Sequence, residues 1–342
     1  MSGKIFVEVK KQTELMGVCL RLSDYKNRYP FLAKDLKNYP YLDEVNEYFI
    51  KFSSHKAIQT LNEVIKLGFS YDAPYAIILY VDDAWNFHGQ NNYPFVDRLK
   101  KSPLVLKFME ELKDFIKETK FEEFFAKHKN YYEEEIKNFN ESMPLDDILP
   151  YMRKFFHKDF DENEFHVVLA LLSTGGGYGR NDFTLKNFYC VESKRQKNGG
   201  EANKKWGINT ATGRSHYLHE FCHPIVNPES DKNLDKVEKP DMPKEEYERL
   251  CASAYPSFYS IVNEYIIRGI QLCYIQDCKE DVQDFLAVNE RVGFNKKVLK
   301  DLANRLNKFK NSNLKFEDEY VDIANTIAKS YNEMNKGKNY GE

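Results

Sequence analysis

The residues best suited to chemistry are five consecutive ones, from His219 to His223, that read His-Glu-x-x-His. Histidines four apart lie on one face of a helix, so His219 and His223 can bind one metal ion. Glu220 lies about 100° around the same helix, from where its carboxylate can accept a proton from a metal-bound water. The spacing therefore predicts a metal-dependent hydrolytic site with Glu220 as general base. The alternative is a solvated helix face that carries two histidines and an acid.

A catalytic zinc ion usually has three protein ligands and one water, so a third ligand is needed. Between Leu250 and Gln276 only Glu264 and Arg268 are charged. A helix as apolar as this should be buried. A buried carboxylate is costly unless it forms an ion pair or binds a metal ion. One interpretation is a buried ion pair within the helix; the other makes Glu264 the third ligand, with Arg268 orienting it. The upstream motif favours the second interpretation and predicts about one Zn²⁺ per chain.

Two helices must position these ligands. Pro224, directly after the motif, predicts a kink or an end of the first helix, because proline lacks a donor and disfavours helical angles before it. Pro256 predicts a break in the later apolar stretch, with a new helix from near Ser257 through Glu264 toward Ile275. Three hydroxyl side chains could cap the helix that carries the motif: Thr210, Thr212 and Ser215.

Hydrolysis of a peptide bond also requires a donor, beside the metal, for the oxyanion of the tetrahedral intermediate. Four side chains that can donate a hydrogen bond are candidates: His216, Tyr178, Tyr255 and Tyr259. The sequence does not choose among them, and a structural role is the alternative for each.

A His-Glu-x-x-His motif followed on a later helix by a glutamate ligand is the pattern of the gluzincin zinc metallopeptidases, and this chain resembles it. The resemblance implies the roles of ligand, base, ligand and ligand for His219, Glu220, His223 and Glu264 in turn. The chain departs from the thermolysin type in two ways. The interval between His223 and Glu264 is longer, and Arg268 stands where an acidic residue would follow the glutamate.

The chain resembles more closely an uncharacterised, mainly bacterial family of His-Glu-x-x-His proteins that is known as a domain of unknown function. The resemblance includes Glu14-Leu15-Met16 with Arg21-Leu22, and the glycine-rich segment Gly175–Gly179. It covers most of the chain, from Thr13 to Met334. It implies a zincin-like catalytic domain that is related to the peptidases.

Hydrophobic periodicity predicts an α+β fold that is mostly α-helical. Helical spacing dominates residues 1–143, including an amphipathic segment at Phe95–Glu118, and strands are expected at Phe165–Ser173 and Thr184–Glu192. We expect a mainly helical N-terminal region over residues 1–143. Over residues 144–342 we expect a zincin-like metallopeptidase domain with a small mixed sheet beside the motif helix, and the two regions can form one compact unit.

The segment Thr174–Gly179 holds four glycines but matches neither a phosphate-binding loop nor a dinucleotide fingerprint. It has two interpretations that the sequence does not separate. One is a flexible turn, and the other is backbone that lines a cleft and lets a peptide approach closely.

The composition limits the kinds of partner. The 50 basic and 53 acidic side chains give no reason to expect nucleic acid or an anionic membrane. No apolar run approaches the ~18 residues of a membrane span, and Glu8 interrupts the short apolar run near the N-terminus, so no signal peptide is predicted. The expected compartment is the cytoplasm for the sequence as written, or the cell exterior if a signal segment was removed. The oligomeric state is not indicated.

Together these patterns predict a zinc-dependent metallopeptidase that hydrolyses a peptide or protein substrate. Two other functions stay open. The fold can serve as a catalytically inactive binding module, although a structural zinc is usually enclosed by four protein ligands and no fourth is evident. A zinc hydrolase that acts on a non-peptide amide or ester is the other.

Overall fold

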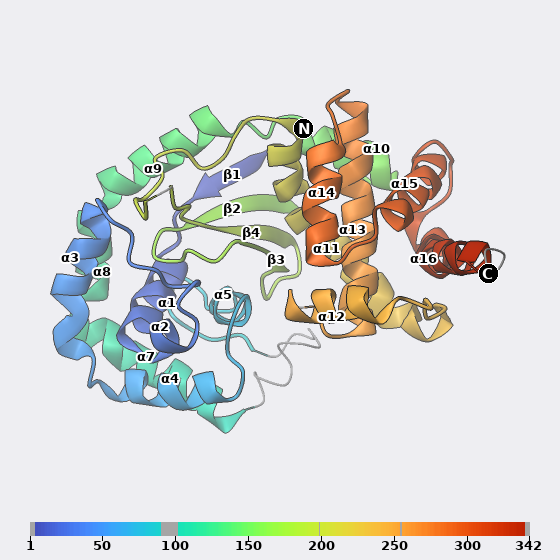
Figure 1. The fold of residues 1–342 in the computed structure, drawn as a ribbon. Coiled ribbons are helices and arrows are strands. Elements are labelled where there is room, and N and C mark those ends of the chain that lie inside the picture. The colour runs from blue at the N-terminus through green and yellow to red at the C-terminus, as the bar shows by residue number, and fades with distance from the viewer. Residues whose placement is uncertain (1–3, 90–101, 198, 254, 339–342) are drawn as a thin grey trace. The chain divides into compact units, whose positions relative to one another are not determined.

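The structure is a computed structural model that describes residues 4–89, 102–197, 199–253 and 255–338. Most of these residues are helical, and the named strands form one small mixed sheet (Figure 1). The predicted α+β, mostly α-helical class is therefore confirmed.

The chain divides into two compact units. The sheet unit comprises residues 4–144 and 162–208, and the helical unit comprises residues 145–161 and the chain from 209 onward. The boundary predicted at 143–144 lies where the chain first passes from one unit to the other. Residues 162–208, however, fold with the N-terminal helices and not with the motif, because their first strand pairs with a strand at the start of the chain.

A four-stranded sheet with the order β1-β2-β4-β3 forms part of the sheet unit. The strands β1 and β4 run parallel to β2, and β3 runs antiparallel to β4 at the edge. Four consecutive residues of β2, from Val167 to Ala170, are buried, as expected for a strand with neighbours on both sides. The strands predicted at Phe165–Ser173 and Thr184–Glu192 are confirmed with shifted ends. The strands are β1 Ile5–Glu8, β2 Glu164–Ala170, β3 Gly177–Asn181 and β4 Asn187–Ser193.

The glycine-rich segment is only in part a turn. Gly176 has a φ of +103°, in the region that favours glycine, and it turns the chain after β2. From Gly177 onward the backbone is strand β3, with Tyr178 opposite Val191 of β4. Neither predicted interpretation included a strand, because periodicity gives little signal in a run of glycines; pairing with β4 supplies the order instead.

Two helices of the sheet unit, α4 and α7, bury one face each, whereas α1 is buried on all sides from Gln12 to Leu20. The predicted helix at Phe95–Glu118 is present from Pro103, and its residues 95–101 lie outside the described part of the chain. The helices are α1 Lys11–Leu22, α2 Tyr25–Arg28, α3 Pro40–Phe49, η1 Ile50–Phe52, α4 Lys56–Lys66, α5 Ala73–Ile78, α7 Pro103–Thr119, α8 Phe121–Lys127 and α9 Lys129–Ser142.

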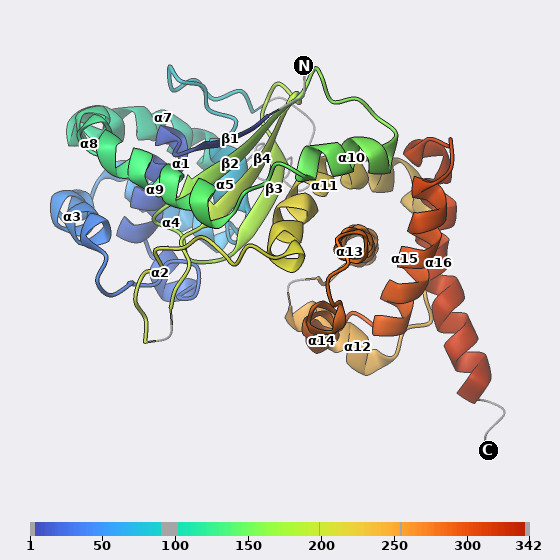
Figure 2. The same ribbon diagram turned by 90° about the horizontal axis from the view of Figure 1, so that it is seen from above.

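The helical unit is arranged around α13, which packs against α11, α15 and α16 and is viewed along its axis in Figure 2. A Cβ at Gly269 would lie 2.7 Å from Cδ1 of Leu306, so this glycine allows α13 and α15 to approach closely. Neither α13 nor any other helix in the described ranges combines the length and hydropathy of a membrane span. The helices are α10 Ile148–Phe156, α11 Ala211–Asn233, η2 Leu234–Lys236, α12 Lys244–Ala252, α13 Phe258–Asp277, α14 Gln283–Val292, α15 Lys296–Lys310 and α16 Phe316–Lys338.

Candidate metal centre

The helix α11 carries the His-Glu-x-x-His motif in its middle. Its N-cap is Thr210, whose hydroxyl accepts a hydrogen bond from the Gly213 amide at 3.0 Å. The predicted end of the helix at Pro224 is wrong, because the helix continues past both Pro224 and Pro228 to Asn233, and the alternative of a kink stays a prediction. Two prolines four residues apart remove donors from one side of the helix, and packing of α11 against α13 and α16 outweighs that local loss.

The second helix of the site starts where the sequence predicts. The helix α12 ends at Ala252, and α13 begins after Ser257, with Pro256 between them. The Ser257 hydroxyl accepts from the Ser260 amide, and the Ser260 hydroxyl closes a reciprocal capping box. This start places Glu264 on a buried face of α13, the helix that packs along α11.

Three side chains of these two helices converge. One ligand-type atom from each of His219, His223 and Glu264 lies within 4.8 Å of the other two, a grouping that could hold a metal ion. The Nε2 atoms of the two histidines are 3.2 Å apart. The Glu264 carboxylate faces both, with Oε2 3.6 Å from Nε2 of His219 and Oε1 3.6 Å from Nε2 of His223.

The hydrogen bonds of Gln271 fix the tautomer of His219. The Gln271 amide nitrogen donates to the carbonyl oxygen of Ser215 at 3.0 Å, and a carbonyl can only accept. The Gln271 amide oxygen must therefore be the atom that faces Nδ1 of His219, at 2.9 Å. Because an amide oxygen only accepts, Nδ1 of His219 carries the proton, and Nε2 presents a lone pair toward Glu264.

An amide also supports His223. The Asn227 side-chain oxygen lies 3.3 Å from Nδ1 of His223, one helical turn further along α11. Two imidazole Nε2 atoms and a carboxylate are thus directed to one point. Lone pairs and a negative charge gathered in this way repel one another unless a cation lies between them.

The Glu264 carboxylate is buried and only partly satisfied by the protein. Its Oε2 atom is 2.9 Å from Nη2 of Arg268, at ion-pair distance, yet it makes no aligned hydrogen bond within the described chain. Burial raises the pKa of Glu264, but Arg268 first, and the two histidines when their rings are protonated, more than offset that effect and hold the pKa well below its usual range. Both interpretations of the Glu264–Arg268 spacing thus hold at once: the ion pair forms, and Glu264 also meets the histidines.

Aromatic and phenolic groups hold Arg268 in place. Its guanidinium lies over the ring of Phe294 at 4.5 Å from the centroid, and its Nη2 donates to the Tyr255 hydroxyl at 2.9 Å. Burial is the largest cause that raises the pKa of Tyr255, so the hydroxyl keeps its own proton. The position of Arg268, and with it that of Oε2 of Glu264, is therefore set by neighbours outside α11.

The proposed base Glu220 lies beside the ligand group. Its side chain is buried, and its Oε2 is 3.9 Å from Nε2 of His223. Its Oε1 is 3.9 Å from Nδ1 of His216, the residue one turn earlier on α11. Glu220 is thus close enough to receive a proton from a water at the site, without belonging to the group of converging ligand atoms.

The four candidate oxyanion donors differ in position. Tyr255 is linked to the candidate ligands through Arg268, which donates a hydrogen bond to its hydroxyl. The charge of Glu264 also contributes to the raised pKa of Tyr255. His216 neighbours Glu220. Tyr259 instead shares a hydrogen bond with the Asp231 carboxyl. Tyr178 is on β3 in the sheet unit, where its hydroxyl donates to the Gly175 carbonyl at 3.0 Å. The oxyanion role of each stays a prediction.

Three contributors to the site were missed by sequence reasoning: Gln271, Asn227 and Phe294. The first two carry a signal in their spacing, because Asn227 is one turn after His223 and Gln271 two turns after Glu264 on the same helix faces. Because neutral amide side chains are common on helices, this spacing identifies Asn227 and Gln271 only after the candidate metal ligands have been chosen. Phe294 follows α14, and nothing in the sequence links it to Arg268.

Comparison with known proteins identifies the family of the chain. The family DUF4932, described as a domain of unknown function, matches residues 5–93 and 96–322. No curated protein and no solved structure matches the chain. The match covers most of the sequence, including α11 and α13, whereas the resemblance to gluzincins stays a prediction. The chain therefore belongs to the DUF4932 family, whose description assigns it no activity.

Proposed function

We propose that this protein is a zinc-dependent metallopeptidase in which His219, His223 and Glu264 hold the metal and Glu220 is the general base. The observation that carries the proposal is the convergence of two imidazole Nε2 atoms and one buried carboxylate on a single point. Two histidines and a glutamate form a donor set that catalytic zinc sites use, with one position left for water. Oε2 of Glu264, which pairs with Arg268 but makes no aligned hydrogen bond within the described residues, fits the same role.

Zinc bound there would supply a water with its pKa lowered to about 7 and would polarise the scissile carbonyl. Glu220 accepts the proton of that water and passes it to the leaving amine, a transfer that its place beside Nε2 of His223 permits. Gln271 and Asn227 keep the histidine rings oriented. Tyr255, which retains its proton, is our preferred donor to the oxyanion.

A peptide-library digestion tests this proposal. Zinc-loaded protein is expected to cleave peptides at defined bonds, which mass spectrometry of the products detects. The Glu220→Gln variant should keep its zinc and lose about 10²–10⁴-fold in rate, the usual contribution of a general base. Glu229→Gln is a matched control on α11, where Glu229 pairs with Lys232, and it should cleave normally.

Two results would contradict the proposal. Full activity of a zinc-loaded Glu220→Gln protein would exclude Glu220 as the base. Absence of peptide cleavage by the zinc-loaded native protein would exclude a peptidase. Hydrolysis of a panel of esters and non-peptide amides would then indicate the non-peptide hydrolase. Inactivity on both kinds of substrate would indicate the binding module.

A further inference from the structure

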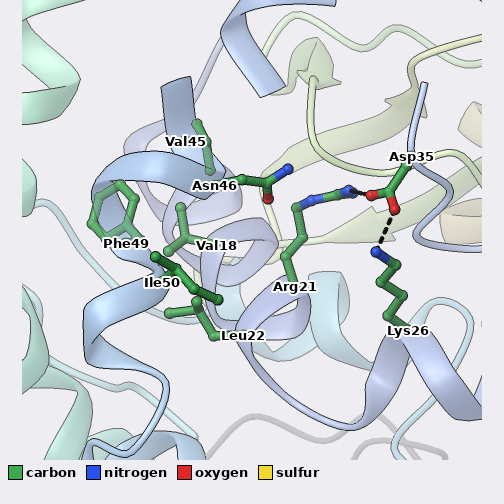
Figure 3. A pocket seen from close by; sticks show the side chains of 9 residues that line it. All are labelled: Val18, Arg21, Leu22, Lys26, Asp35, Val45, Asn46, Phe49 and Ile50. Atoms are coloured by element: carbon green, nitrogen blue, oxygen red, sulfur yellow. Dashed lines mark hydrogen bonds and ion pairs between the residues drawn. The ribbon is translucent and has the colours of Figure 1, made fainter. Parts of the chain in front are cut away.

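A pocket on the sheet unit has a charged side and an apolar side (Figure 3). Its volume is about 280 Å³, which suits a ligand smaller than the drug-sized molecules that occupy most pockets. The lining comes from α1, α2, α3, the first residue of η1 and the loop that holds Asp35, all within residues 18–50. Nothing in the candidate metal centre uses these residues.

The charged side carries an excess of positive charge. Nη2 of Arg21 lies 2.6 Å from one oxygen of Asp35, and the ammonium group of Lys26 pairs with the other oxygen. Two cations facing one carboxylate leave one positive charge uncompensated in the lining. A pocket of this kind attracts an anion with a single negative charge.

The position of that charge is fixed by the fold. Nη1 of Arg21 donates to the carbonyl oxygens of Leu172 and Lys34, at 3.3 and 3.4 Å, and the Arg21 side chain is only 4% exposed. Its Nε is buried and makes no hydrogen bond with the described chain. Arg21 therefore provides a preorganised charge, while the more exposed Lys26 can adjust to a ligand.

Asn46 adds a polar group without a protein partner. Its side-chain amide makes no hydrogen bond with any residue in the described ranges, and Figure 3 shows it beside Arg21 at the pocket. An amide N–H in this place can donate to an anionic oxygen. Asn46 and Lys26 together can thus hold the two oxygens of one carboxylate.

The opposite side of the pocket is apolar. Val18, Val45 and Phe49 lie behind its surface and are almost fully buried, so the apolar surface open to a ligand comes mainly from Ile50, which is 62% exposed, and from the partly exposed Leu22. An exposed isoleucine beside a buried apolar wall loses water favourably when a branched apolar group covers it. The pocket thus presents a carboxylate site and an apolar site side by side.

We propose that this pocket binds a small carboxylate that carries a short apolar group, as the C-terminal residue of a peptide does. A free short-chain fatty acid offers the same chemistry. The inference is independent of the proposed peptidase activity, since it rests only on residues of the sheet unit.

Calorimetric titration of the full-length protein tests the pocket, with N-acetyl-L-leucine as the probe. A ligand of this size should bind with a Kd on the order of 1 mM. N-acetyl-L-leucinamide, which lacks the charge, should bind at least about tenfold more weakly. Titration with hexanoate distinguishes a peptide C-terminus from a free fatty acid as the natural ligand. Weaker binding of hexanoate than of N-acetyl-L-leucine supports the peptide C-terminus. Tighter binding supports the free acid, which is also a carboxylate with an apolar group.

Two surface variants locate the binding. Lys26→Gln should weaken N-acetyl-L-leucine about two- to fivefold, and Asn46→Asp should weaken it more because it adds a like charge. Lys66→Gln on α4, where Lys66 pairs with Glu63, is the control and should bind normally. Arg21 is left intact, because it holds two backbone carbonyls. Equal affinity for the leucinamide, unchanged affinity in both variants, or no binding at all would overturn the proposal.

Discussion

Two buried glutamates, Glu264 in the helical unit and Glu14 in the sheet unit, have opposite electrostatic surroundings. Burial raises the pKa of Glu14 to about 7, against the opposing effects of hydrogen bonds from Tyr41 and Leu171. Burial acts in the same direction on Glu264, yet Arg268 first, and the two histidines when their rings are protonated, bring its pKa well below the usual range. Burial alone therefore does not set the charge of a carboxylate; the neighbouring positive groups do.

The two carboxylates also differ in how the protein satisfies them. One Glu14 oxygen accepts from the Tyr41 hydroxyl at 2.7 Å, and the other accepts from the Leu171 amide at 2.9 Å. This arrangement joins α1 to α3 and to the chain after β2, and it is closed. Oε2 of Glu264 pairs with Arg268 but makes no aligned hydrogen bond within the described residues, and it faces Nε2 of His219. A carboxylate whose two oxygens both accept hydrogen bonds, such as Glu14, stabilises the fold. A carboxylate that faces imidazole lone pairs, such as Glu264, is suited to bind a cation.

The largest expected difference between the two positions is in metal content. Glu264→Ala should lower the zinc content of the purified protein sharply, because it removes one of three ligands. Glu14→Gln should leave the zinc content unchanged, since glutamine can still accept from the Leu171 amide and reach Tyr41. Elemental mass spectrometry of both variants measures this, and equal zinc content in the two would remove Glu264 from the site.

A smaller effect is expected from the amides that orient the histidines. Gln271→Ala should weaken zinc binding about 10- to 100-fold, the usual effect of losing a group that orients a ligand. Competition with a chromophoric chelator measures the affinity without relying on activity. Gln276→Ala, on an exposed position of α13, is the matched control. Equal affinities in the two variants would show that Gln271 does not support His219.

The smallest effect concerns pH and separates Glu14 from the metal site. The pKa of Glu14 in the folded state, about 7, exceeds its ordinary value of 4.5, so folding favours the protonated form. The stabilisation is complete below about pH 4.5 and is lost as the pH rises through 7. Between pH 5 and 8 the native protein should lose about 2 kcal/mol of unfolding free energy relative to Glu14→Gln.

Urea unfolding of both proteins at the two pH values measures that loss. The comparison between variants cancels the titration of all other groups. A difference that stays constant with pH would mean that Glu14 titrates in its ordinary range despite its burial.

The candidate ligand residues and the start of α13 could be picked out from the sequence because their signals are local. The spacing of His219, Glu220 and His223 has meaning in any helix, and Pro256 with Ser257 marks a helix start by backbone chemistry alone. Glu264 stood out because a lone acid with Arg268 in an apolar stretch demands a partner.

The remaining features depend on packing between distant segments. The passage of α11 through Pro224 follows from its contacts with α13, which no local rule contains. The strand β3 exists because β4 pairs with it, although glycines disfavour strands. The pairing of β1 with β2 likewise places residues 162–208 in the sheet unit. A single predicted boundary near residue 143 cannot describe a chain that returns to its first unit.

The most direct test of the metal centre is the zinc content of the untagged protein, measured by mass spectrometry beside His219→Ala and His88→Ala. His88 pairs with Asp82 in the sheet unit and serves as the control for loss of an imidazole. We expect about one zinc per chain in the native protein and in His88→Ala, and near-complete loss in His219→Ala. No zinc in the native protein after zinc is offered, or equal zinc in His219→Ala, would contradict this expectation.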